Sequence, residues 1–326
     1  MLADDIWRKL IHRSNLALNY HVGNDMLADE INRKLTKTDQ GTGCGSLMRL
    51  YWQPVALTDE LAGNRPVVPV RIFGEDLVLF RNVSGEIGLI DRHCPHRQVD
   101  LCYGRLEENG LRCPFHGWLF APDGTCLDQP GELPENNRVR HFGQANYPCA
   151  ERNGMIFAYL GPGDPPPLPA VDCLQAPDSH VFAFKGFLEC NYLQALEGGI
   201  DSSHVGFLHS GELKSDPLHH GSKGSNYHMA DRKPKFEVEE APFGLSIGVR
   251  RNAENEQFYW RVTPWIMPWY TIVPPYGDNP LNGHAWVPID DHNCFAWTFS
   301  YHPSRPLNQK ELKIMQKGGK VFDPDS

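Results

Sequence analysis

The first part of the chain carries its apolar residues in short runs that turn residues interrupt. From Tyr51 to about Leu160, PVVPVRIFG, EDLVLFRNV, EIGLIDR and GMIFAYLGP place Val, Ile, Leu and Phe in strand-length pieces with Gly or Asn at the breaks. Runs of this length and composition are typical of β-strands. LRCPFHGWLFAPDGTCL (111–127) predicts a hairpin that closes on Asp123 and Gly124. We therefore expect a small all-β domain in this part.

A proline-rich stretch separates this region from a second one. GPGDPPPLP (161–169) is too rich in proline for a helix or strand and predicts a stiff linker. Beyond it, NYLQALEGGIDSSH (191–204) predicts a helix, and alternating, aromatic-rich runs from Lys235 onward predict an antiparallel sheet. The pattern predicts an α+β protein with a helical segment at 1–45, an all-β domain at 46–160, a linker at 161–170 and a sheet-and-helix domain at 171–326.

The N-terminal segment contains a repeat. MLADDIWRKL (1–10) recurs as MLADEINRKL (26–35), with eight of ten positions identical. Both copies space their apolar residues as an amphipathic helix does, so each predicts a short helix. A single repeat does not build a solenoid, and we interpret it as a duplicated start or a sequence-assembly scar.

Composition narrows the class of protein. Hydrophobic residues make up 40% and charged residues 22% of the 326 residues, as in soluble globular proteins. The net charge of −9 argues against a nucleic-acid binder. The chain lacks an eighteen-residue apolar run and a secretory signal, so we expect no membrane span. Nine cysteines in such a chain indicate reduced thiols or metal ligands, and a cytoplasmic protein.

Two short motifs combine one cysteine and one histidine each. CPH (94–96) and CPFH (113–116) are separated by sixteen residues. Two thiolates and two imidazoles could hold tetrahedral zinc, or a [2Fe–2S] cluster in which two histidines replace two cysteines on one iron. Zinc fingers usually group Cys with Cys and His with His, whereas each loop here offers one of each. The mixed loops favour a cluster held between two hairpins.

These loops resemble the Rieske family. CPHRQ, the sixteen-residue spacing and CPFHGW match the family pattern through both loops. Respiratory members carry an extra cysteine in each loop, where this chain has Val99 and Phe115, so the resemblance is to the oxygenase and ferredoxin branch. It implies a Rieske [2Fe–2S] domain at 46–160, with Cys94 and Cys113 on one iron and His96 and His116 on the other. The other seven cysteines show no ligand spacing and are interpreted as buried thiols.

A second group of polar residues lies in EGGIDSSHVGFLH (197–209). On an ideal helix Asp201 and His204 are about 60° apart and share a face, whereas His204 and His209 are about 140° apart. The two histidines can converge on one ion only if the helix bends or ends between them, which Gly206 permits. Two imidazoles and one carboxylate form the facial triad of non-haem Fe(II) oxygenases. The polar side of a solvated helix is the alternative interpretation.

Behind the Rieske loops and the linker, this segment resembles the oxygenase (α) subunits of Rieske non-haem iron aromatic ring-hydroxylating oxygenases. ECNYLQALEGGIDSSHVGFLH (189–209) looks most like the phthalate-dioxygenase-type branch, and the similarity runs over about 41–303. The resemblance implies a helix-grip-like catalytic domain at 171–326, with His204 and His209 as ligands of a mononuclear Fe(II). It makes Asp201 a bridging acid, hydrogen-bonded to His204 and to a cluster histidine of a neighbouring subunit.

The third iron ligand departs from the family pattern. In the family an aspartate comes from a late C-terminal helix, at a position that would fall beyond Ser326, so we expect a truncated chain with an incomplete catalytic domain. Asp290 and Asp291 are interpreted as a turn between strands, and Asp323 and Asp325 as part of a frayed tail. Of the other polar residues, Glu197 is interpreted as a support of the site or a solvated acid, Asn191 as the helix start, and His219, His220, His284, His292 and His302 as residues without a metal role.

The resemblance implies a terminal oxygenase component. Electrons from a separate NAD(P)H-dependent flavin/iron–sulfur reductase would pass through the cluster to the mononuclear iron, and O2 would be activated against an aromatic substrate. The chain has no G-x-G-x-x-G fingerprint, which places the reductase in another protein. The resemblance also implies a homotrimer. Phthalate-like ring dihydroxylation is the first interpretation. O-demethylation of a methoxylated aromatic acid, a truncated electron carrier without turnover and a zinc-stabilised binding module are the alternatives.

Residues of the late sheet are the candidates for contact with the substrate. Trp260, Trp265, Trp269 and Tyr270 could line a pocket, although aromatic residues at strand spacing more often belong to a core. The last candidates are Arg250, Arg251 and Arg261, which could meet a substrate carboxylate and which we interpret as solvated surface residues.

Overall fold

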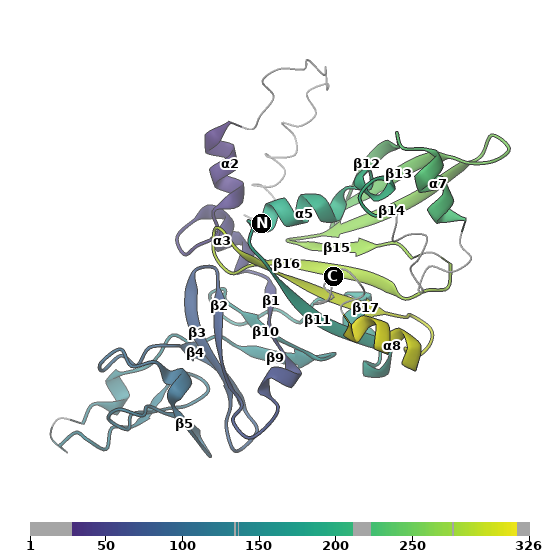
Figure 1. The fold of residues 1–326 in the computed structure, drawn as a ribbon. Helices are drawn as coiled ribbons and strands as arrows, with labels where there is room; N and C mark the ends of the chain where they lie inside the picture. The colour runs from purple at the N-terminus through teal and green to yellow at the C-terminus, as the bar shows by residue number, and fades with distance from the viewer. Residues whose placement is uncertain (1–27, 134, 136, 211–222, 276, 318–326) are drawn as a thin grey trace.

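The computed structural model of the chain describes residues 28–133, 135, 137–210, 223–275 and 277–317. Two units built around β-sheets lie next to each other in Figure 1, with the small sheets of the first unit at the lower left and the large sheet of the second at the right. Among the described helices, none is long and apolar enough to cross a membrane. The α+β class predicted from the residue pattern is confirmed.

Two short helices precede the first unit. They are α2 (Asp29–Thr36) and α3 (Gly43–Met48). The helix predicted for the second copy of the repeat is confirmed by α2, and the first copy lies outside the described residues. The Tyr192 hydroxyl donates to the Leu35 carbonyl over 2.7 Å, so α2 is attached to the second unit.

The first unit consists of three small antiparallel sheets. Their strands are β1 (Trp52–Leu57), β10 (Met155–Tyr159) and β9 (Cys149–Arg152); β2 (Val67–Ile72), β3 (Glu75–Arg81) and β4 (Ile87–Asp91); and β5 (Arg105–Glu107), β6 (Gly110–Arg112), β7 (Leu119–Phe120) and β8 (Cys126–Asp128). The pairing of Trp52 with Tyr159 joins the two ends of the unit. The hairpin predicted on Asp123 and Gly124 is confirmed between β7 and β8, where Gly124 has a φ of 77°.

The segment after β10 carries neither helix nor strand over 161–171. The Trp52 indole N–H donates to the Pro166 carbonyl over 2.7 Å, which fastens the proline run to the first unit. Beyond it lie α4 (Asp172–Gln175) and the second unit.

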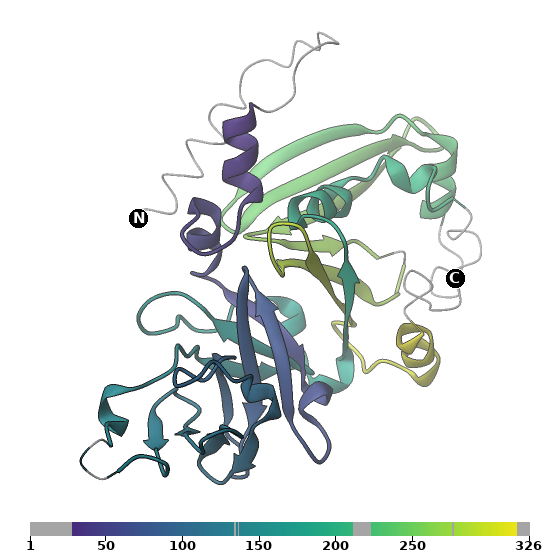
Figure 2. The same ribbon diagram turned by 60° about the vertical axis from the view of Figure 1, so that its left-hand side comes forward.

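The second unit is a seven-stranded antiparallel sheet. Its order is β11 (Val181–Leu188), β17 (Cys294–Tyr301), β16 (Leu281–Pro288), β15 (Tyr270–Val273), β14 (Phe258–Ile266), β13 (Gly244–Asn252) and β12 (Lys235–Ala241). One face carries α5 (Tyr192–Ile200), which lies so close to β16 and β15 that a Cβ on Gly199 would be 2.8 Å from Trp286 and 3.0 Å from Thr271. The first unit contacts the edge strand β11 through β1, and one continuous core joins the two units. Figure 2 shows α5 lying across the sheet.

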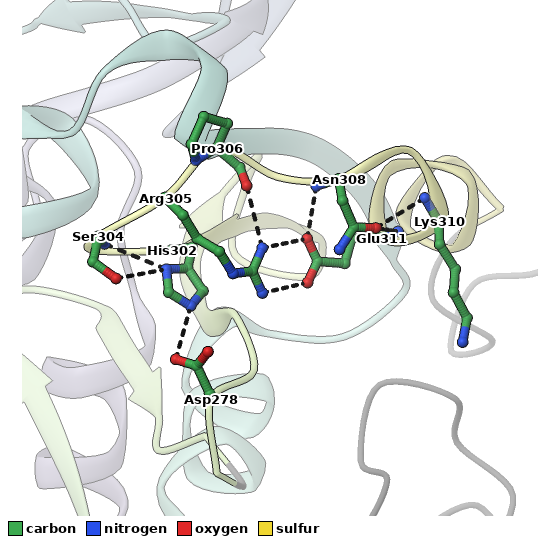
Figure 3. Close-up of polar contacts among 8 residues, drawn as sticks. All are labelled: Asp278, His302, Ser304, Arg305, Pro306, Asn308, Lys310 and Glu311. Carbon is green, nitrogen blue, oxygen red and sulfur yellow. Dashed lines mark hydrogen bonds and ion pairs between the residues drawn. The ribbon is translucent and has the colours of Figure 1, made fainter.

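Polar contacts fix the segment between β17 and α8 (Gln309–Gln316) (Figure 3). Asn308 caps the helix by accepting the N–H groups of Lys310 and Glu311, both over 3.0 Å. Arg305 donates to both carboxylate oxygens of Glu311. The ring of His302 is buried and contacts the exposed Asp278 over 3.2 Å. His302 therefore contacts Asp278 and Ser304 in the loops around the end of β17.

Candidate functional site

The two Cys–His motifs occupy tight loops of the first unit. The first loop follows β4, and the second connects β6 and β7. In the first, the Cys94 N–H donates to the Val99 carbonyl over 2.9 Å; in the second, the Cys113 N–H donates to the Trp118 carbonyl over 2.8 Å. Gly117 has a φ of 77°, and a Cβ there would lie 2.8 Å from the ring of Pro130. The backbone therefore fixes both loops, and glycine is required where the second one turns.

The structure brings the four residues predicted as cluster ligands together. The ring centroids of His96 and His116 are 4.6 Å apart. Cys94 and Cys113 are buried, with 2% and 4% exposure, whereas His116 is exposed. His96 stacks on the indole of Trp118 at 4.9 Å with 4° between the ring planes. The arrangement presents two buried sulfurs and two imidazoles nearer the surface.

Two features of these loops fit an iron–sulfur cluster. Nδ1 of His96 is buried and has no hydrogen-bond partner among the atoms of the structure, as expected of a nitrogen whose natural partner is a metal. Burial raises the pKa of the Cys94 thiol, although the N–H groups of His96 and Arg97 donate to its sulfur and oppose that shift. A bound cation would supply the charge that holds such a sulfur as thiolate. The donor set of two thiolates and two imidazoles is that of a Rieske cluster.

The second predicted site begins at the end of α5. Asn191 caps the start of the helix by accepting the Leu193 N–H over 3.0 Å, which confirms its predicted place. The helix was predicted to continue to 204 but ends at Ile200. The prediction of one helix to 204 is therefore wrong. Gly198 and Gly199 are weak helix formers, and the Asp201 carboxylate accepts the N–H groups of Ser203 and His204, which a longer helix would bond to its own carbonyls. This ending is what lets the later histidines turn toward each other.

Asp201 organises the turn after the helix. One carboxylate oxygen accepts the Ser203 N–H over 2.8 Å, and the other accepts the His204 N–H over 2.9 Å and lies 2.8 Å from Nδ1 of His204. Burial opposes ionisation of Asp201, but these donors outweigh it and lower its pKa. The carboxylate therefore stays charged at neutral pH and fixes both the backbone and the ring of His204.

The two predicted histidine ligands are brought close together. His204 starts the 3-10 turn η5 (His204–Gly206), and its ring centroid lies 5.2 Å from that of His209 at an interplanar angle of 67°. A Cβ at Gly206 would lie 2.6 Å from the carbonyl oxygen of His228, in α7 (Gly224–Ala230), so only glycine allows this approach. Because α5 ends before His204, the rings of His204 and His209 can approach each other without a bend within a helix.

In the described part of the chain, no carboxylate joins the two histidines as a third metal ligand. There, no three His, Cys, Asp or Glu side chains converge closely enough to hold one ion. Asp290 and Asp291 lie in the turn between β16 and β17, as predicted, where Asp291 accepts the Thr38 N–H over 2.8 Å. Glu197 is exposed on α5. Of the remaining candidates, His219, His220, Asp323 and Asp325 lie outside the described residues.

The prediction that the three arginines are solvated is wrong for two of them. Arg251 is 1% exposed and Arg261 is 7% exposed. Both point toward backbone carbonyls, of Ser202 and Pro274 respectively, which accept from their guanidinium groups. The alternation of residues along a strand cannot reveal these buried arginines. It indicates which side chains face the core, but not which backbone carbonyls lie there to accept from a guanidinium group. Sequence reasoning named Arg251 as a candidate but missed its burial and its contact with the turn at Ser202.

The aromatic candidates for the pocket divide between core and surface. Trp269 and Tyr270 are buried with 0% and 5% exposure, and Trp265 with 7%. Trp260 is 42% exposed and lies 6.0 Å from the guanidinium of Arg250. Buried residues of the late sheet therefore form its core, as the alternative interpretation had it.

Two family matches cover most of the chain. Residues 51–148 match the Rieske [2Fe-2S] domain, and residues 158–317 match the LigXa C-terminal domain like family. The chain belongs to the family of oxygenase subunits of Rieske-type oxygenases, as the sequence resemblance predicted.

Several characterised members are similar along most of this chain. It is 37% identical over 293 residues to the oxygenase subunit of 3-chlorobenzoate-3,4-dioxygenase of Comamonas testosteroni, covering 88% of this chain and 66% of that one. It is 36% identical over 309 residues to the phthalate 4,5-dioxygenase oxygenase subunit of Pseudomonas putida, covering 90% and 68%. It is 32% identical over 308 residues to the 5,5'-dehydrodivanillate O-demethylase oxygenase subunit of Sphingobium sp. (strain NBRC 103272 / SYK-6), covering 89% and 67%. The chain thus spans about two thirds of the length of these relatives.

A solved structure shares the fold. Dicamba monooxygenase bound to dicamba superposes with a TM-score of 0.65 at 19% sequence identity, covering 85% of each chain. The architecture of an all-β Rieske domain followed by a sheet-rich domain with few helices is confirmed.

Proposed function

We propose that this chain is the terminal oxygenase component of a Rieske-type aromatic oxygenase that hydroxylates an aromatic substrate, with phthalate-like ring dihydroxylation as the reaction. The observation that carries the proposal is the close pair of His204 and His209 after α5. Asp201 forms a hydrogen bond with the ring of His204. In the same chain, the first unit holds the two Cys–His loops.

The residues would hold two metal groups. Cys94 and Cys113 would bind one iron of a [2Fe–2S] cluster, and His96 and His116 the other. His204 and His209 would bind a mononuclear Fe(II), with a carboxylate completing the triad. When bound, the cluster supplies single electrons and the mononuclear iron supplies the open positions at which O2 reacts.

The side chains around the second site prepare it for a metal. Because His204 Nδ1 lies 2.8 Å from the ionised Asp201, its proton is held on that nitrogen and Nε2 keeps its lone pair for a metal. Asp201 also accepts two backbone N–H groups, so the acid cannot rotate away from the ring without breaking them. The role of Asp201 is therefore to hold a proton at Nδ1 and to orient the ring.

We further propose that electrons cross between subunits of a homotrimer. The Cys–His loops lie beside β5 and β6 in the sequence, and the turn with His204 follows α5. In both views of the chain, the end of the first unit that carries β5 lies far from α5 (Figures 1 and 2). Two large apolar side chains close to the Cys–His loops in the sequence are exposed: Phe115 to 59% and Tyr103 to 73%. Such a surface suits contact with a neighbouring copy. Asp201 would then bond a cluster histidine of the next subunit as well as His204.

The remaining components follow from the same proposal. A separate NAD(P)H-dependent flavin/iron–sulfur reductase would supply the electrons. The cytoplasm is the proposed compartment, and it is supported by nine cysteines of which none forms a disulfide. The proposed division is a helical segment at 1–45, a Rieske domain at 46–160, a linker at 161–170 and a catalytic domain at 171–326.

A mixing experiment tests this function. Cys113→Ser should remove the cluster and His204→Ala the mononuclear site, so each variant alone should fail to turn over an aromatic acid with a reductase and NADH. Co-expressed in one oligomer, they should regain activity, because an intact cluster then faces an intact iron site across a subunit boundary. The same chains mixed only after purification, without exchange of subunits, serve as the control. Activity of wild type with none from the mixed oligomers would refute electron transfer between subunits.

O-demethylation is the second candidate, because a 32% identical relative is named an O-demethylase subunit. Product analysis separates the two reactions. A methoxylated aromatic acid would give formaldehyde and a phenol, whereas ring dihydroxylation would give a cis-diol. Iron and acid-labile sulfide, measured on protein purified anaerobically with Fe(II), test the electron-carrier alternative. That alternative predicts no iron beyond the cluster.

A further inference from the structure

A buried arginine forms hydrogen bonds with the turn that carries Asp201 and His204. Arg251 lies on β13 and is 1% exposed. Its Nη2 donates to the Ser202 carbonyl over 2.6 Å, and its Nη1 donates to the Ser202 hydroxyl over 3.2 Å. Ser202 itself is 7% exposed. A buried charged side chain thus binds both the backbone and the side chain of this turn.

The bond to Ser202 acts on the peptide unit that orients Asp201. The Ser202 carbonyl and the Ser203 N–H belong to one planar trans peptide, so they point in opposite directions. The carbonyl end is held by Arg251, and the N–H end donates to the Asp201 carboxylate over 2.8 Å. Each bond polarises the peptide in the sense that strengthens the other. Arg251, the peptide, Asp201 and His204 therefore form one chain of hydrogen bonds.

We propose that Arg251 is a positioning residue for the mononuclear iron site, acting through this peptide and Asp201 on the ring of His204. The inference rests on the proposed function. An arginine suits the task because its planar fork reaches the carbonyl and the hydroxyl of Ser202 at once, which a lysine cannot do. Its positive charge also lies beside the C-terminal end of α5, where the helix dipole favours a cation.

The chain offers a matched control on the neighbouring strand. Arg261 of β14 pairs with Val249 of β13, is 7% exposed and also donates to a backbone carbonyl, that of Pro274. It therefore shares with Arg251 its residue type, its burial and its kind of bond. Pro274 lies outside the turn at 201–204, so removal of Arg261 should reproduce the loss of packing but not the loss of positioning.

The experiment compares full-length Arg251→Met, Arg251→Lys, Arg251→Ala and Arg261→Met with wild type. Cluster content is measured by visible absorbance and acid-labile sulfide. Second-site affinity is measured by anaerobic titration with Co(II), whose d–d absorption reports its coordination. We expect Arg251→Met to weaken Co(II) binding about 10- to 100-fold, the usual effect of losing a residue that orients a metal ligand. Its cluster content should stay at the wild-type level.

The other variants separate positioning from stability. Arg251→Lys keeps the positive charge and one donor nitrogen, and should lose less affinity than Arg251→Met. Millimolar methylguanidinium should restore Co(II) affinity and the d–d spectrum to Arg251→Ala, and have no effect on wild type. Arg261→Met should lower the Tm as Arg251→Met does while binding Co(II) normally.

Three results would overturn the inference. One is wild-type Co(II) affinity in Arg251→Met, another is an equal loss in Arg261→Met, and the third is failure of methylguanidinium to restore the site. If wild type itself binds no Co(II) beyond the cluster, the proposed function fails together with this inference. Co(II) binding by wild type and by Arg251→Met alike refutes the inference only.

Discussion

Two adjacent glycines near the end of α5 should respond in opposite directions to the same substitution. A Cβ at Gly199 would lie 2.8 Å from Nε1 and 2.9 Å from Cζ2 of Trp286, well inside van der Waals contact. That indole cannot move freely, because it donates to the Thr271 hydroxyl over 3.1 Å and stacks on His284 at 5.0 Å. A Cβ at Gly198 would meet nothing within 4 Å.

The size of the difference follows from these surroundings. Gly198→Ala should raise the free energy of unfolding by roughly 0.5–1 kcal/mol, the usual gain of alanine in a helix. Gly199→Ala has the same gain, but overpacking costs about 1–3 kcal/mol, so a net loss of up to about 2 kcal/mol is expected. At about 2–4 °C per kcal/mol for a domain of this size, the Tm values of the two variants should be clearly separated.

The assay is thermal unfolding of both variants and wild type, followed by Co(II) titration. The displaced helix end carries Asp201, so Gly199→Ala should also weaken the second metal site, whereas Gly198→Ala should leave it unchanged. Equal Tm values for the two variants, or a higher Tm for Gly199→Ala, would show that α5 is not packed against Trp286 as described.

Three further outcomes are expected. Asp201→Asn should lower turnover about 10- to 100-fold with cluster absorbance unchanged, because the amide cannot hold His204 as the carboxylate does; wild-type turnover would contradict this. The hydrogen bond to Arg112 lowers the pKa of Glu107 to about 2 in the folded protein. The ionised Glu107 therefore stabilises the fold fully above the pKa of roughly 4.3 that a glutamate has in the unfolded chain, and this stabilisation is lost as the pH falls toward 2. Urea unfolding should show that loss in wild type and not in Glu107→Gln, and parallel profiles would refute it. Asn308→Ala should lower the free energy of unfolding by about 1 kcal/mol through loss of the α8 cap, and an unchanged Tm would contradict that.

The cluster loops could be predicted because their chemistry is local in the sequence. Each loop supplies its own cysteine and histidine within a few residues, and proline and glycine fix its shape. Only the approach of the two loops is long-range. The strand runs on either side already predict the hairpins that produce it, so the ring pair of His96 and His116 follows from short-range patterns.

The second site depends on contacts that the sequence does not show. Ending α5 at Ile200 needs the Asp201 side chain to compete with the helix for backbone amides, a balance that residue spacing alone leaves open. Burial of Arg251 depends on which strand lies under the turn. The sheet order places β13 there, although about fifty residues separate it from Ser202. Pairing of distant strands is a property of the whole fold, which is why this residue looked solvated.

The strand order also sets a sequence of events during synthesis. β1 pairs with β10, so the first unit has all its strands once Tyr159 has left the ribosome. The second unit begins with β11, which in the described part of the chain pairs within the sheet with β17, about a hundred residues later. The turn at 201–204 is therefore made before Arg251 and Trp286, and it lacks their support until β13 and β16 have been synthesised. We expect the cluster loops to be ready for assembly on the growing chain before the mononuclear site can accept its metal.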